Sequence, residues 1–118
     1  MFKNSFDKFV TETPGFWGGV IIGIDGIPVE QRYLSDRINL ENTATEYITL
    51  LKKSNQINEQ ENLGQVQEAI FINQNIVILL HHINSEYYFL SAFDPKANLG
   101  MIRFKVIQLI ADILREFS

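Results

Sequence analysis

Three short apolar runs without polar–apolar alternation constrain the fold of this chain most strongly. They occupy residues 17–24, 76–81 and 87–93, and turn-forming residues separate them from their neighbours. Successive side chains of a strand point to opposite faces of a sheet, so a strand that is apolar at every position is covered on both faces. The sequence therefore predicts a central sheet between two layers.

A hairpin joins the first of these runs to a more polar strand. Asp25-Gly26 fits a two-residue type I′ turn between residues 17–24 and 27–34. The return strand carries Pro28 and several charged side chains. Proline donates no ladder hydrogen bond and charges discourage further pairing, so we expect this strand at a protected edge of the sheet.

Residues 63–73 form a strand of a different kind. Its stretch Ala69-Ile70-Phe71-Ile72 contains neither proline nor charge. At an exposed edge such a stretch offers a template for pairing with another chain. The residues alone leave two interpretations open: an internal strand, or an edge strand that pairs with a second copy across a two-fold axis.

Helical periodicity predicts the layers that cover the sheet. Apolar stripes at helical spacing occur over residues 2–10, 40–51 and 99–117, and Asn39 and Asn98 are suitable N-caps for the second and third helices. Residues 54–62 are rich in Asn, Gln and Glu and are predicted to form a loop. The 118 residues make one domain, residues 1–118, of the α/β class (an α+β sandwich), with two helices on one face of an antiparallel sheet and one on the other.

Composition argues against several classes of protein. The net charge is −4, which disfavours binding to nucleic acid or to an anionic membrane. There is no cysteine for disulfides or thiolate metal sites, and no apolar run long enough to span a membrane. With no recognisable secretory signal, we expect a cytoplasmic protein.

No constellation of residues indicates catalysis. His81 and His82 are adjacent on a strand and point to opposite faces, so they cannot chelate one ion together. No Walker phosphate loop and no acid/base pair of carboxylates is present. Arg32 and Arg37 lie where they would reach a partner, but ordinary surface solvation explains them better. We assign no catalytic residue, no metal site and no cofactor.

Two segments resemble a known family. Residues 19–29 (GVIIGIDGIPV) and 97–103 (ANLGMIR) resemble the first hairpin and the entry to the last helix of the Roadblock / dynein light chain family, and most of all its prokaryotic MglB-like subgroup. The resemblance implies a profilin-like or longin-like five-stranded antiparallel sheet, with helices one and three on one face and helix two on the other. It also implies a homodimer and a small Ras-like GTPase as partner.

The resemblance places the dimer contact along the third strand and the second helix. Helical spacing puts Thr43, Glu46 and Leu50 on one face beside the core stripe. The residues expected at the dimer interface are Thr43, Glu46, Tyr47, Leu50, Ala69, Ile70, Phe71 and Ile72. Those expected to meet the GTPase are Glu41, Thr45, Thr49 and Lys52.

Three functional hypotheses follow. The first is a homodimeric regulator of a small Ras-like GTPase, which activates hydrolysis by stabilising a productive switch-loop conformation. The second is a scaffold that uses the same dimer to hold a complex without changing hydrolysis. The third is a small-ligand sensor, which requires an internal pocket with convergent polar groups.

Overall fold

The computed structural model describes residues 3–117, so the predicted contribution of Phe2 to the first apolar stripe lies outside the described residues. The elements in chain order are α1 (Lys3–Glu12), β1 (Phe16–Gly23), β2 (Pro28–Tyr33), α2 (Leu40–Gln60), β3 (Glu68–Ile72), β4 (Val77–His82), β5 (Tyr87–Phe93) and α3 (Leu99–Phe117).

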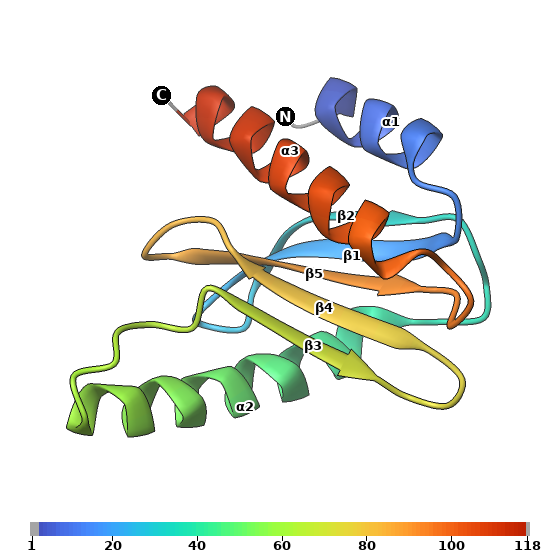
Figure 1. The fold of residues 1–118 in the computed structure, drawn as a ribbon. Helices are drawn as coiled ribbons and strands as arrows, with labels where there is room; N and C mark the ends of the chain where they lie inside the picture. The colour runs from blue at the N-terminus through green and yellow to red at the C-terminus, as the bar shows by residue number, and fades with distance from the viewer. Residues whose placement is uncertain (1–2, 118) are drawn as a thin grey trace.

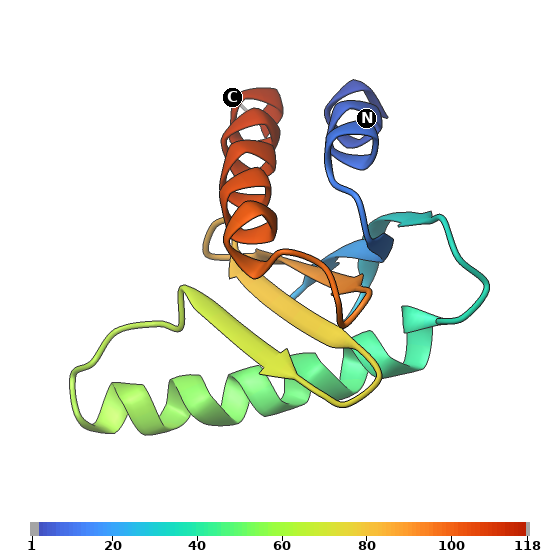
Figure 2. The same ribbon diagram turned by 45° about the vertical axis from the view of Figure 1, so that its right-hand side comes forward.

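The strands form one antiparallel sheet in the order β2-β1-β5-β4-β3. The three apolar runs thus become the three inner strands, as their lack of alternation predicts. Figure 1 shows α1 and α3 over one face of this sheet and α2 along the other, and the turned view in Figure 2 separates the two layers. The predicted five-stranded α+β sandwich is confirmed.

The strand order shows which two strands form the edges of the sheet. β2 lies at one edge, in agreement with its proline and charges. β3 lies at the other edge, so of the two interpretations left open for this strand the internal one is wrong. The strand is also shorter than predicted, because Glu68–Ile72 pair with β4 while residues 63–67 have no regular structure except a bond from His82 N to Gln67 O.

Two buried clusters hold the layers together. One lies between the sheet and the α1–α3 pair and is rich in phenylalanine; Phe9 packs edge-on against Phe16 and Phe89. The other lies between the sheet and α2 and includes Ala44, Ile48 and other aliphatic side chains. Along each inner strand, successive side chains lie alternately in one cluster and in the other. This explains why these strands are apolar throughout.

The turn between β1 and β2 differs from the prediction. Gly26 has a φ of +87°, but among the described residues Asn62 is the only non-glycine residue with positive φ, so Asp25 lacks the conformation that a type I′ turn requires. Gly26 N donates to Gly23 O and Gly23 N donates to Ile27 O. The loop is therefore a three-residue connection, a turn followed by a glycine in the left-handed region.

The predicted loop over residues 54–62 is also wrong. The helix α2 continues to Gln60, and Asn62, with a φ of 56°, follows its end. Glutamine and glutamate are good helix formers, and no glycine or proline interrupts the chain before Gly64. An amide-rich composition is therefore compatible with an exposed helix as well as with a loop.

Candidate functional site

The helix α2 presents two different sides to solvent. Its sheet-facing stripe, Leu40, Ala44, Ile48 and Leu51, is buried. At about 100° per residue, Thr43, Glu46 and Leu50 fall on the side toward β3, whereas Thr45 and Thr49 fall on the side toward the β1–β2 hairpin. The residues predicted from the sequence therefore separate into two surfaces, one on each flank of the helix.

An apolar groove lies between α2 and the β3 edge. It has a volume of about 220 Å³ and is lined almost entirely by apolar atoms. Its lining residues are Tyr47, Leu50, Leu51, Ser54, Val66, Ala69, Phe71 and Leu80. Half of the residues predicted for the dimer interface are in this list, so the groove is the candidate functional site.

The predicted interface residues contribute to the groove in different ways. Tyr47 and Phe71 join its two walls, with ring centroids 5.1 Å apart, and Leu50 is 50% exposed at its rim. Ala69 shares the face of Phe71 because alternate residues of a strand point the same way. Ile70 points to the opposite face and packs against the α1–α3 cluster, so the structure does not bring it into the groove.

The remaining predicted interface residues do not line the groove. Thr43 is half-buried and Glu46 is exposed, both on the flank of α2 that faces β3. Ile72 ends β3 and is 68% exposed, which is an unusual exposure for isoleucine in a strand. Because alternate residues of a strand point the same way, its side chain lies on the face of Ile70, opposite the groove.

The outer rim of β3 carries backbone groups that pair with no strand of residues 3–117. Asn73 N donates to Ile76 O, and His82 N donates to Gln67 O. These two bonds show which residues of β3 direct their backbone groups toward β4. Hydrogen-bonded positions alternate along an antiparallel strand, so Glu68, Ile70 and Ile72 direct their N–H and C=O groups away from β4. This rim is open to an added strand.

Part of the apolar surface on α2 is not predicted from the sequence, because residues 54–62 are predicted to form a loop whereas α2 continues to Gln60. Ser54 lines the groove, and Ile57 lies seven positions beyond Leu50, on the same flank, with 52% exposure. Val66 closes the groove from the irregular segment before β3. The Leu50–Ile57 spacing was the available signal, and it becomes readable only once residues 54–60 are helical.

The opposite flank of α2 is polar. Glu41, Thr45, Thr49 and Lys52 are all exposed, so the four residues predicted to meet a GTPase form one accessible stripe. The Thr45 and Thr49 hydroxyls donate to carbonyl oxygens one turn earlier, at 3.4 and 3.1 Å. Gly26 of the β1–β2 hairpin lies beside the Thr45 methyl group. The stripe is therefore bordered by the hairpin.

A larger concavity of about 670 Å³ lies at the C-terminal half of this flank. Lys52, Asn55, Glu59, Gln65 and Tyr88 are among its lining residues, and it is open to solvent. A ligand sensor requires a pocket that encloses most of its ligand. Neither this concavity nor the groove is enclosed, so the described residues give the sensor hypothesis no support.

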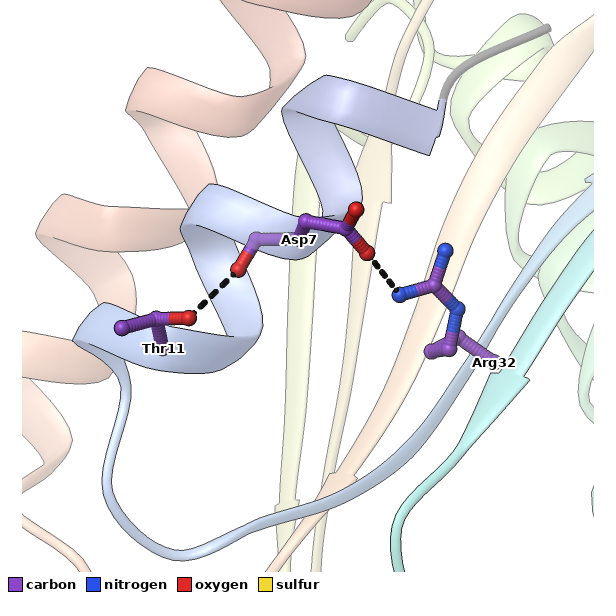
Figure 3. A network of polar contacts seen from close by, with 3 residues as sticks. All are labelled: Asp7, Thr11 and Arg32. Atoms are coloured by element: carbon purple, nitrogen blue, oxygen red, sulfur yellow. Dashed lines mark hydrogen bonds and ion pairs between the residues drawn. The ribbon is translucent and has the colours of Figure 1, made fainter.

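The two candidate arginines are engaged within the chain. Arg32 Nη1 donates to Asp7 Oδ1 at 2.6 Å, and its guanidinium lies 5.6 Å from the centroid of the Phe6 ring. Figure 3 shows this contact between α1 and β2, with the Thr11 hydroxyl bonded to the Asp7 carbonyl. Arg37 lies 5.4 Å from the ring of Trp17. Both positions fit a structural role better than contact with a partner's phosphate.

The histidines do not form a metal site. His81 Nδ1 lies 2.8 Å from the His82 carbonyl oxygen, and the His82 ring packs edge-on against Tyr88. Burial lowers the pKa of His82, and the positive charge of His81 lowers it further. Within residues 3–117 no cluster of three or more His, Asp or Glu side chains is arranged to hold a metal ion.

None of the helices described is both long and apolar enough to cross a membrane.

Comparison with known proteins identifies the fold. No protein-family profile and no curated protein sequence matches the chain. Among solved structures, Myxococcus xanthus MglB is similar over 98% of this chain and 94% of its own, with a TM-score of 0.87 and 9% identity. A Roadblock/LC7 domain from Streptomyces avermitilis is similar over 94% and 92%, with a TM-score of 0.81 and 12% identity. Myxococcus xanthus MglC matches 98% of both chains, with a TM-score of 0.67 and 20% identity.

These similarities cover nearly the whole chain. A profilin from Acanthamoeba castellanii, with a TM-score of 0.61, is a more distant match. The chain therefore has the fold of MglB and of the Roadblock/LC7 domains, as the resemblance of residues 19–29 and 97–103 implied.

Proposed function

We propose that this chain is a homodimeric regulator of a small Ras-like GTPase. The observation that carries the proposal is the open rim of β3 beside an apolar groove of about 220 Å³. The fold shared with MglB and the Roadblock/LC7 domains supports the same partner class. The chain needs no cofactor for this role and supplies no catalytic residue.

The first step of the proposal is dimer formation. Two β3 strands related by a two-fold axis pair through the outward backbone groups of Glu68, Ile70 and Ile72, which makes one continuous sheet of two subunits. The α2 flanks toward β3 then meet, and the second copy covers Leu50, Ile57 and the groove. Covering exposed apolar surface supplies the driving force.

The second step is recognition of the GTPase. Dimerisation through one flank of α2 leaves the stripe Glu41, Thr45, Thr49 and Lys52 accessible on the other flank of each subunit. Contact there stabilises a hydrolysis-competent arrangement of the switch loops of the GTPase. Because Arg32 and Arg37 are engaged within the chain, the activation acts through the residues of the GTPase itself.

The dimer is tested by proline substitutions on the two edges of the sheet. Ile70→Pro removes an outward N–H and no bond to β4, so the subunit folds but an added strand is blocked. The control is Gln31→Pro on β2, where the bond from Leu34 N to Trp17 O places the Gln31 N–H outward in the same way.

We expect light scattering to give a monomer mass for Ile70→Pro and a dimer mass for Gln31→Pro. Leu50→Arg, at a side chain that is 50% exposed, weakens the dimer without unfolding the subunit. A monomeric wild-type chain at high concentration, or a folded Ile70→Pro variant that stays dimeric, contradicts the pairing.

The GTPase step is tested separately. The probe is a small Ras-like GTPase that co-purifies with the chain, and GTP turnover is measured with and without the chain. Thr45→Arg with Thr49→Arg places bulk on the outer stripe far from the groove, so we expect loss of stimulation while the dimer mass is retained. Unchanged stimulation of GTP turnover by this variant contradicts the proposed contact between the stripe and the GTPase.

The scaffold is the second candidate, because the same dimer offers the same surfaces. It is distinguished by nucleotide dependence. Binding that is equal for the GTP and GDP states, with no change in turnover, favours a scaffold, whereas preference for the GTP state with faster turnover favours the regulator.

A further inference from the structure

The concavity of about 670 Å³ at the C-terminal half of α2 is built from segments that are distant in sequence. Lys52 and Glu59 of α2 line it, together with Asn62 and Gln65 of the connection to β3 and Ser85 of the β4–β5 turn. Figure 1 shows the C-terminal end of α2, this connection and the β4–β5 turn at the same end of the sheet. The concavity is therefore an open site at one end of the subunit.

Several polar side chains of this concavity have no partner within their own chain. Lys52, Gln56, Glu59 and Gln65 line it and are exposed. In residues 3–117, which the structure describes, none of these four side chains takes part in a hydrogen bond or an ion pair. A ligand can therefore bind these groups without breaking a contact of the subunit.

The α2 wall of the concavity carries opposite charges at its two ends. Lys52 and Glu59 are seven residues apart in the helix, which places them on the same side and about 10 Å apart along its axis. The last turn of α2 contains no basic residue, so the partial negative charge of the helix C-terminus adds to that of Glu59. The concavity thus offers a cation at one end of this wall and an anion at the other.

Carboxamide side chains make up much of the remaining lining. Gln56 of α2 and Asn62 and Gln65 of the connection each carry both a hydrogen-bond donor and an acceptor. A peptide backbone likewise presents one N–H and one C=O per residue, proline excepted. These carboxamides are therefore suited to bind the main chain of a peptide whose own backbone groups are unpaired.

An extended segment in the polyproline II conformation matches both features. Its backbone makes no internal hydrogen bonds, and its three residues per turn bring positions i and i+3 to one side, about 9 Å apart. That spacing is close to the separation of Lys52 and Glu59 along α2. We propose that this concavity binds an extended segment of a partner protein that carries an acidic and a basic residue three positions apart. The acidic residue pairs with Lys52, the basic residue pairs with Glu59, and the carboxamides bind the backbone.

This site is separate from the proposed dimer interface. None of the residues that line the apolar groove lines the concavity, so a dimer paired through β3 leaves the site open. The concavity shares Lys52 with the stripe proposed to meet a GTPase. The test therefore uses the chain and synthetic peptides without a GTPase, and its failure is distinct from a failure of the proposed function.

The probes are four capped, proline-containing peptides of equal length, because proline favours the extended conformation. Two carry Asp and Lys three positions apart, one in each order; the third carries Asp at both positions and the fourth carries Lys at both. We expect NMR titration to show that the better mixed peptide binds at least about fivefold tighter than either like-charged peptide, with the difference decreasing as salt is added. Equal affinities, or no binding of a mixed peptide at millimolar concentration, overturn the proposal.

A charge reversal tests the pairing with Lys52. Lys52→Glu places carboxylates at both ends of the α2 wall, so we expect this variant to bind the peptide with two lysines at least about fivefold tighter than the mixed peptides. The matched control is Lys53→Glu, at an exposed neighbour that does not line the concavity, which keeps the preference of the wild type. A Lys52→Glu variant that still prefers a mixed peptide overturns the assignment.

The backbone contact is tested with a carboxamide. Gln65→Ala is expected to weaken binding of both mixed peptides about threefold or more, because each loses a hydrogen bond to its main chain. Gln60→Ala, at an exposed position of α2 outside the lining, is the control and leaves binding unchanged. In the wild type, the amide signals of residues 52–65 and 85–88 should shift on binding. Shifts confined to other residues, or equal effects of the two substitutions, overturn the assignment to this concavity.

Discussion

At the scale of single residues, two glycines of β1 allow aromatic rings to lie close to the sheet. A Cβ atom at Gly19 would lie 2.9 Å from two ring atoms of Phe89, and one at Gly18 would lie 2.6 Å from the Tyr33 ring. Contacts this short do not occur between real side chains, so the glycines are required by packing on opposite faces of one strand.

We predict that Gly19→Ala destabilises the fold by about 1–3 kcal/mol, because the added methyl group forces the buried Phe89 ring to move. The matched control is Gly100→Ala in the first turn of α3, where the nearest atom to a new Cβ is Asn98 Oδ1 at 3.5 Å. That variant is expected to be neutral or stabilising by up to about 1 kcal/mol. Urea denaturation measures both, and equal stabilities contradict the packing argument.

His82 makes the free energy of unfolding depend on pH. Burial, aided by the charge of His81, lowers the pKa of His82 in the folded chain. Below the unfolded pKa of about 6.5, the unfolded chain binds a proton that the folded chain resists. The contribution of His82 to unfolding free energy therefore decreases as pH falls below about 6.5 and is steady above it.

Stability measured across this range should depend less on pH in His82→Gln than in the wild type. His81→Gln removes a positive neighbour and is expected to reduce the dependence without abolishing it. A His82→Gln variant with the pH profile of the wild type shows that another group is responsible.

At the scale of elements, the last turns of α2 depend on a few polar contacts. The buried residues of α2 end at Leu51, and beyond it Asn55 Oδ1 accepts a bond from Val66 N at 2.8 Å. The Tyr88 hydroxyl donates to Val66 O at 2.7 Å. These two bonds attach the segment before β3 to both α2 and the sheet, and so shape one wall of the groove.

We predict that Asn55→Ala destabilises the chain by about 1–3 kcal/mol, because the half-buried Val66 N–H loses its partner. Hydrogen exchange at Val66 and in residues 55–60 should become faster, with the inner strands unaffected. Gln56→Ala, at an exposed neighbouring position, is the control and should change stability by less than about 0.5 kcal/mol. Equal effects of the two substitutions on stability would contradict a stabilising role for the Asn55–Val66 hydrogen bond.

At the scale of the whole molecule, the proposed dimer couples stability to concentration. If the second copy binds only the folded subunit, the Tm rises with protein concentration. Calorimetry over a hundredfold range of concentration should show this rise for the wild type and for Gln31→Pro, but not for Ile70→Pro. A Tm that is independent of concentration in all three proteins argues against a dimer that contributes to stability.

The sequence alone determined the layers of this protein. The unbroken apolar runs at 76–81 and 87–93 indicated inner strands, and the helical stripes indicated the covers, because local periodicity records which faces are buried. Asn39 and Asn98 were identified as caps for the same reason: a cap bond spans only two or three residues, here to Glu41 N and Met101 N. Periodicity and cap bonds involve only residues that are close in sequence, so the sequence alone is enough to predict them.

Tertiary structure decided what the two flanks of α2 face. The groove joins Tyr47 to Phe71 and Ser54 to Val66, and the engagement of Arg32 by Asp7 likewise joins distant segments. No local pattern encodes such contacts, because they depend on the order of strands in the sheet. Within the described part of the chain, that order leaves β3 with one neighbouring strand. An unpaired strand rim is a property of the assembled sheet rather than of the residues that form it.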